Sequence, residues 1–178
     1  MAISKLGGAA VLGSYYFGLA GHPGAGDALW GGVPEALKPF YTVSMLTAAA
    51  GYFPFTYLFV FRIDPDRVRI AGSPGLGWVL LFYALVLVPS AMWLPLTLQL
   101  ASAWSEGLWT AIRLVLALVG LGSLGILFSI IRLAPVPSRA LHIAAIVGAI
   151  AFCVQTALLD ATVWPAFYPI PTSALGEP

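Results

Sequence analysis

Charge is what this sequence has least of. Only 8% of its 178 residues are Asp, Glu, Lys or Arg, whereas 60% are hydrophobic, and the mean hydropathy is +0.94. Soluble domains carry about 25% charged residues, so this chain has too few to cover a surface that faces water. The composition therefore predicts an integral membrane protein whose first partner is the lipid bilayer.

Other scarcities exclude further classes of protein. The single cysteine, Cys153, lies in an apolar run, which excludes an intrachain disulfide framework and a cysteine-based zinc site. The formal net charge of +1 does not favour a nucleic-acid partner. The sequence contains no HExxH, Walker A or GxSxG motif, so it predicts no metal, no cofactor and no catalytic residues of those kinds.

Long apolar runs are what the chain has instead. A run of about 20 apolar residues is long enough to cross a bilayer as a helix, and five such runs are present. The first follows Lys5 and in part fits a signal peptide, but we interpret it as a helix. We expect an all-α integral membrane bundle, one domain over 1–178 with a proline-rich outer tail at 165–178. The five transmembrane helices are expected at about 6–21, 40–61, 77–103, 108–131 and 141–164.

The positions of Lys and Arg predict the orientation, because basic residues concentrate in cytoplasmic loops. With the N-terminus inside and the C-terminus outside, six basic residues fall on the inner side and two on the outer side. This predicts a multi-pass protein of a plasma or inner membrane. The inner set is Lys5, Arg62, Arg67, Arg69, Arg132 and Arg139, and the outer set is Lys38 and Arg113.

One carboxylate, Asp160, lies inside the fifth run, in QTALLDATVW. A charge at the centre of a bilayer costs about 2.5–3.5 kcal/mol on insertion scales. Counted from a hinge near Pro137, Arg113 is 24 residues up the fourth helix and Asp160 is 23 residues up the fifth. Equal depth predicts a buried ion pair between them. Two alternatives stay open: the two residues face water separately, or Asp160 binds a ligand or moves a proton.

Prolines inside two of the runs predict bent helices, because each removes a backbone hydrogen bond. Pro89 and Pro95 lie in the third run and Pro54 in the second. The bends either fit the helices to their neighbours or open a pocket for an apolar ligand. The residues expected to line that pocket are Trp93, Ser90, Gln99, Tyr52, Tyr57, Tyr83 and Gln155.

Three short stretches carry a looser signal. Trp30, the step Leu37–Lys38–Pro39 and Trp93 occur in a layout with a long loop after the first helix. This layout resembles the tryptophan-rich translocator proteins, which implies a five-helix bundle with a pocket for porphyrin-like or sterol-like molecules. The chain departs from that pattern in two places. It reads FYTVSM after Lys38–Pro39 in place of a run of tryptophan and proline, and no asparagine precedes Trp93.

Three classes of function remain. Short loops and the lack of a catalytic motif favour a non-enzymatic bundle, as a subunit of a membrane complex or a homodimer. The alternative is a binder or carrier of a sterol-, porphyrin- or lipid-like molecule in the pocket between the bent helices. The third is a membrane-embedded enzyme in which Asp160 acts as acid or base.

Overall fold

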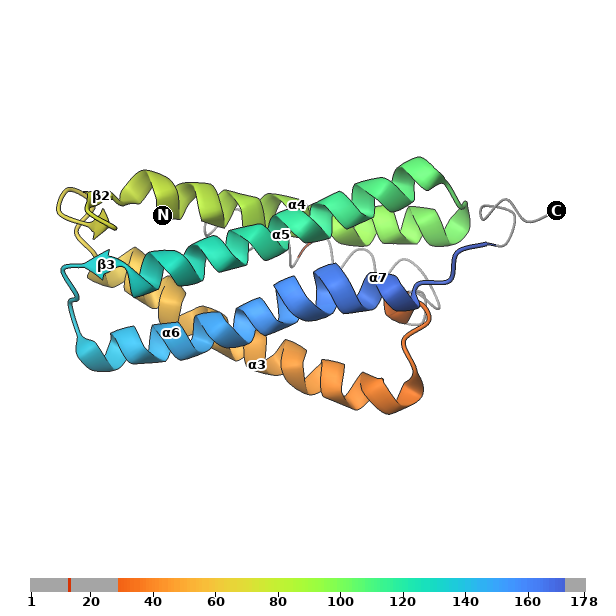
Figure 1. Cartoon of the computed structure of the whole chain (residues 1–178), viewed down its shortest axis with the longest axis horizontal. Helices are drawn as coiled ribbons and strands as arrows, with labels where there is room; N and C mark the ends of the chain where they lie inside the picture. The colour runs from red at the N-terminus through yellow and green to blue at the C-terminus, as the bar shows by residue number, and fades with distance from the viewer. Residues whose placement is uncertain (1–12, 14–28, 172–178) are drawn as a thin grey trace.

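The computed structural model describes residue 13 and residues 29–171, and it is a bundle of long helices (Figure 1). Four of the described helices are long and apolar enough to cross a membrane. The helix expected at 6–21 lies outside the described residues, except for residue 13, as does the tail from residue 172 onward. The four spans are Glu35–Arg62, Leu76–Ser102, Glu106–Ile131 and Arg139–Phe167.

Two of these spans change their winding along their length. The first span contains a 3-10 turn, an α-helix and a π-helical turn, and the last contains an α-helix, a longer π-helical segment and a final α-helical turn. Tyr57 and Cys153 are the last residues before the two π segments. The bounds are η1 Glu35–Leu37, α3 Lys38–Tyr57, η2 Leu58–Arg62, α4 Leu76–Ser102, α5 Glu106–Ile131, α6 Arg139–Cys153, η3 Val154–Val163 and α7 Trp164–Phe167.

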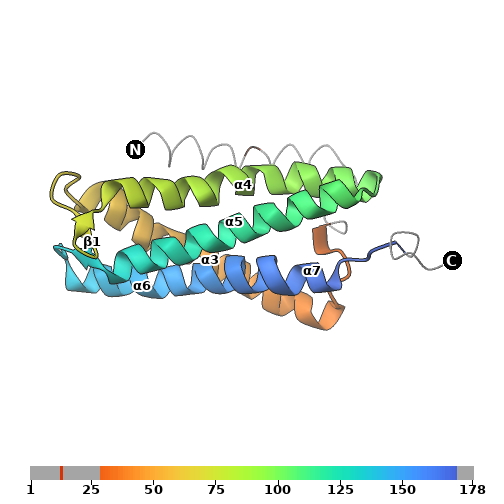
Figure 2. The ribbon, with the colours of Figure 1, turned by 45° about the horizontal axis from the view of Figure 1, so that its top comes forward.

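The packing follows from the lengths of the links. Only residues 103–105 separate α4 from α5, so these two helices form an antiparallel pair along most of their length. The chain through α6 and η3 packs beside α5 on one side and against α3 on the other, as Figures 1 and 2 show. The α3 helix therefore joins the bundle chiefly through α6, a helix about 100 residues further along the sequence.

A small antiparallel sheet, which the apolar runs do not predict, ties two loops together at one end. Strand β1 (Arg69–Ile70) pairs with β2 (Ser73–Pro74) and with β3 (Leu133–Ala134). The β1–β2 turn has positive φ at both central residues, +51° at Ala71 and +84° at Gly72, as a two-residue hairpin turn requires. The sheet joins the α3–α4 loop to the α5–α6 loop, and we call this end of the bundle the sheet end.

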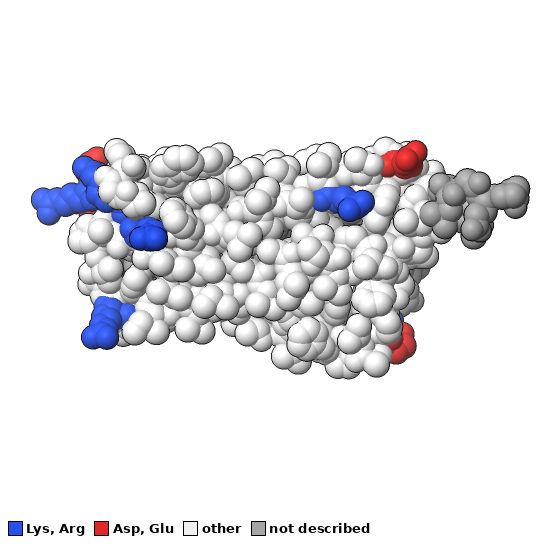
Figure 3. All heavy atoms as spheres, viewed as in Figure 1, with Lys and Arg blue, Asp and Glu red and all other residues white. Residues whose placement is uncertain are grey.

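The sheet end is also the basic end. Figure 3 shows basic side chains gathered there, whereas the flank of the bundle is almost entirely uncharged. All of the arginines that the structure describes at this end are exposed. They are Arg62, Arg67, Arg69, Arg132 and Arg139.

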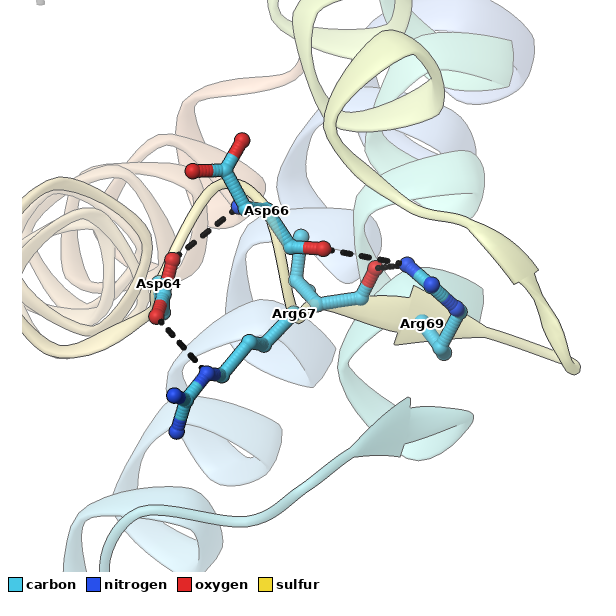
Figure 4. A network of polar contacts seen from close by, with 5 residues as sticks. Asp64, Asp66, Arg67 and Arg69 are labelled. Carbon is cyan, nitrogen blue, oxygen red and sulfur yellow. Dashed lines mark hydrogen bonds and ion pairs between the residues drawn. The ribbon is translucent and has the colours of Figure 1, made fainter.

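The two aspartates of the loop between α3 and α4 take part in the hydrogen bonds of its turn (Figure 4). Asp64 accepts a hydrogen bond from the Asp66 backbone N–H at 3.0 Å and forms an ion pair with Arg67 at 3.4 Å. Arg69 donates to the backbone carbonyls of Asp66 and Val68. Because their polar partners come from the same loop, these residues shape the link between α3 and α4.

Glycines set the closest helix contact in the bundle, between α3 and α6. A Cβ atom built on Gly51 would lie 2.6 Å from the Gly148 carbonyl oxygen, nearer than any real Cβ approaches. The backbones of the two helices therefore touch at this crossing. Ala145 and Ala149, on the same side of α6, are 0% and 1% exposed, so small residues here serve packing within the chain.

Candidate functional site

The candidate site is the π-helical segment η3, where Gln155 and Asp160 meet. The Gln155 Nε2 atom donates a hydrogen bond of 2.8 Å to Asp160 Oδ1. In an α-helix, residues five apart point about 140° away from each other. The wider turn of a π-helix, which closes i→i+5 hydrogen bonds, places them on one side. The change of winding is therefore what brings the amide and the carboxylate together.

Helix α3 supplies a third polar group to this site. The Tyr41 side chain is 3% exposed, and its hydroxyl donates to the Leu159 carbonyl oxygen at 3.4 Å. Thr156 donates back to the Phe152 carbonyl at 2.8 Å. The Tyr41 bond thus supplies a donor to a carbonyl of η3, and the Thr156 bond supplies one to a carbonyl of the last turn of α6.

One atom of the site has no hydrogen-bond partner among the residues that the structure describes. Gln155 is 6% exposed, and its Oε1 atom is buried without a hydrogen bond to any described residue. A buried amide oxygen left unpaired costs about 1–3 kcal/mol. Changes of winding to π-helix are frequent at functional sites. The combination makes Gln155 and Asp160 the best candidates for a binding site in the described part of the chain.

The predicted ion pair between Arg113 and Asp160 is not formed. The ion pairs among residues 29–171 are Lys38–Glu35 and Arg67–Asp64. Arg113 is exposed on α5, and Asp160 is bonded to Gln155.

The reason is a difference in depth. A Cβ on Gly120 would lie 3.1 Å from Ala157 Cα and 3.6 Å from Ala161 Cβ, so Asp160 is level with Gly120. Arg113 is seven residues, or about 10 Å, nearer the start of α5. Counting residues from Pro137 gave the wrong relative depth because the two helices do not start at equal distances from that proline. Helix α5 ends six residues before Pro137, whereas α6 begins two residues after it.

An aromatic cluster surrounds the end of the bundle opposite the sheet, next to the polar site. The ring of Trp164 lies 6.0 Å from Trp93, 6.2 Å from Trp109 and 4.9 Å from Tyr168. Trp164 Nε1 donates to the Leu29 carbonyl at 2.9 Å. Rings packed in this way hold the end of the last span against α4 and α5.

The seven residues expected to line one pocket are distributed over the bundle. Tyr52 and Tyr83 belong to a second aromatic group nearer the sheet end, where Thr56 Oγ1 and the Tyr83 hydroxyl lie 3.1 Å apart. Trp93 is in the cluster around Trp164, and Gln155 is beside Asp160. Ser90 is half-buried on α4, and Tyr57 and Gln99 are exposed.

Two apolar hollows lie on the described surface, and none of those seven residues lines either of them. The larger, of about 310 Å³, lies between α5 and the α6–η3 span. The smaller, of about 220 Å³, lies at the sheet end. No group of three or more His, Cys, Asp or Glu within the described ranges is placed to hold a metal ion.

Comparison with known proteins does not assign this bundle to a family. No family model, no curated protein and no solved structure matches the chain. The resemblance to the translocator proteins accordingly stays a prediction. What the fold itself defines is the class: a helical bundle whose described helices have the length and composition of a multi-pass membrane protein.

The Gln155–Asp160 pair was the part of the site that sequence reasoning missed. It assigned Gln155 to a pocket and Asp160 to Arg113, because helical spacing does not bring residues five apart together. The available signal was the pair of polar residues in QTALLD, five apart in an apolar span. Tyr41, which bonds to the carbonyl next to Asp160, was not singled out.

Proposed function

We propose that the protein is a subunit of a membrane complex and that α3 is the helix through which it contacts its partner chain. The observation that carries this proposal is the exposure of α3. In an apolar stretch of 18 residues, 22% of the residues are buried in the Glu35–Arg62 span, against 50% in the Glu106–Ile131 span. Helix α3 meets the bundle along one narrow side, at the crossing of Gly51 with Gly148.

The composition of the exposed side of α3 supports a protein contact. In lipid, apolarity alone does not separate a lipid-facing surface from an interface, but small and hydroxyl side chains favour helix association. Thr42 and Ala49 are exposed and lie seven residues apart, which places them on the same side of the helix. Phe53, one turn further on, is 73% exposed. The exposed side of α5 carries Thr110 and Ala117 at the same spacing, but it also carries four leucines and a charged residue, Arg113.

This proposal predicts that a bulky residue on α3 removes the partner. Native mass spectrometry of the wild-type protein, extracted gently from its own membrane, is expected to show a defined second chain, either another protein or a second copy. Ala49→Trp should abolish that species because the small contact side chain is lost. Leu121→Trp, on the exposed side of α5, is the matched control and should keep it. A bare monomer for the wild type would refute the proposal.

We infer the orientation from the basic sheet end, which faces the inner side by the positive-inside rule. In a Cys153→Ala background, Ser105→Cys is expected to react with a membrane-impermeant maleimide in intact cells. Arg67→Cys, at the sheet end, should react only after the membrane is permeabilised. Labelling in the reverse order would place the sheet end outside. This arrangement puts the N-terminus inside only if residues 6–21 cross the membrane as a fifth helix.

A second function, ligand binding, is favoured by the unpaired Gln155 Oε1 atom beside Asp160. A small molecule with a hydrogen-bond donor would satisfy this oxygen, and the rings around Trp164 would contact its apolar part. The same mass spectra distinguish this candidate. A discrete bound mass that is lost in Gln155→Leu and kept in Ala49→Trp would support it. The enzyme hypothesis, with Asp160 as acid or base, stays a prediction.

A further inference from the structure

Arg113 is the one described cation whose position neither the sheet end nor an ion pair explains. It lies seven residues inside the start of α5, its side chain is exposed, and the next residue, Leu114, is 60% exposed. Figure 3 shows a basic group on the flank of the bundle, apart from both ends. An arginine in this position extends along the helix so that its guanidinium reaches the headgroup region.

The larger apolar hollow lies on the same side of the bundle. It is a groove of about 310 Å³ between α5 and the α6–η3 span. Its walls contain no charged residue. The lining residues are Leu124, Leu127, Ile150, Cys153, Val154, Ala157 and Leu158.

Helix geometry aligns the cation with the groove. Leu124 follows Arg113 by eleven residues, which is three turns and about 20°, so both lie on one side of α5. The rise over those eleven residues is about 16 Å. One leaflet of the hydrocarbon core is about 15 Å thick. A chain anchored at Arg113 and running along α5 would therefore reach the groove near its end.

A carboxylate completes the pattern. Glu106 is exposed, lies seven residues before Arg113 and, two turns away, shares its side of the helix. No ion pair joins these two residues. The surface thus presents a cation at the membrane boundary with an anion further out. A lipid headgroup with its phosphate at the membrane boundary and its amine further out would match this order of charges.

We propose that this side of α5 binds a zwitterionic glycerophospholipid of the leaflet at the start of α5. The phosphate bonds to the Arg113 guanidinium, which recognises phosphate in bidentate fashion. The amine is directed toward Glu106, and one acyl chain follows α5 into the groove. A second protein chain fits this surface less well, because covering Arg113 would remove its charge from water without supplying an anion.

The test uses the full-length protein in nanodiscs of phosphatidylethanolamine and phosphatidylglycerol in equal amounts, analysed by native mass spectrometry after release. One phosphatidylethanolamine is expected to remain bound at energies that remove the other lipids. In Arg113→Ala, the retained fraction should fall about tenfold, as for the loss of one charge-assisted contact. Arg139→Ala, an exposed arginine at the sheet end, is the matched control and should retain the lipid.

Two further variants separate the headgroup from the chain. Val154→Trp, which fills the groove from an exposed position, should lower retention without changing the thermal unfolding midpoint. Glu106→Gln should remove the preference for phosphatidylethanolamine over phosphatidylglycerol. Equal retention in Arg113→Ala and Arg139→Ala would overturn the proposal. So would a wild-type protein that keeps phosphatidylglycerol as well as phosphatidylethanolamine, or that keeps neither.

Discussion

Replacing Gly148 with alanine is expected to destabilise the bundle by about 1–3 kcal/mol, and replacing it with leucine by more. The added carbon has no room, because α3 and α6 touch backbone to backbone where Gly148 meets Gly51. Neither backbone can move without displacing the buried residues on both sides of the crossing. The effect should appear as a lower midpoint of thermal unfolding in detergent.

The control for this result is Gly77→Ala in the first turn of α4. A Cβ on Gly77 would meet nothing within 4 Å, so this change should be neutral or stabilise the protein by about 0.5–1 kcal/mol through helix propensity. Gly51→Ala should reproduce the loss seen for Gly148→Ala. If Gly148→Ala and Gly77→Ala unfold at the same temperature, the close crossing is absent from the native protein.

Replacing Asp160 with alanine is expected to cost about 1–3 kcal/mol, because it leaves both polar ends of the buried Gln155 amide without partners. Asp160→Asn should cost less, since an asparagine oxygen still accepts from Gln155 Nε2. The double variant Gln155→Leu, Asp160→Leu should recover much of the loss, because both polar groups are then removed together. Thermal unfolding of the wild type, the single variants Gln155→Leu and Asp160→Leu and this double variant gives the coupling free energy, expected at about 0.5–3 kcal/mol for residues in contact.

Arg113→Ala separates this arrangement from the ion pair predicted from the sequence. Since Arg113 is exposed and Asp160 is bonded to Gln155, removing the guanidinium should leave the unfolding midpoint of a lipid-free sample unchanged. Additive effects of Arg113→Ala and Asp160→Ala are expected. A strong coupling between those two changes would restore the ion pair and contradict the geometry of η3.

The features that the sequence predicted are those that depend on short stretches of chain. The spans observed at Leu76–Ser102 and Glu106–Ile131 differ from the expected ranges by no more than two residues at each end. Run length and hydropathy are local properties, and so is the short link that makes α4 and α5 antiparallel.

The features it missed depend on the relative positions of distant segments. Nothing in TAAAGYF or AAIVGAI shows that Gly51 and Gly148 meet, since they are nearly 100 residues apart. The three two-residue strands are too short to produce a recognisable pattern. The depth of Asp160 relative to Arg113 was predicted wrongly. The stagger of α5 against α6 depends on where each helix ends and not on residue counts from a proline.

By itself, the sequence determined that this chain is a multi-helix protein of membrane composition with its basic residues collected in certain loops. These properties follow from the solvation of side chains, which each segment carries independently of its neighbours. Only the tertiary structure decided which helices touch, where α5 and α6 are level, and that Asp160 pairs with Gln155. Those outcomes depend on close packing between helices and on the change of winding in η3, because a buried polar group bonds to whichever partner the surrounding backbone places within reach.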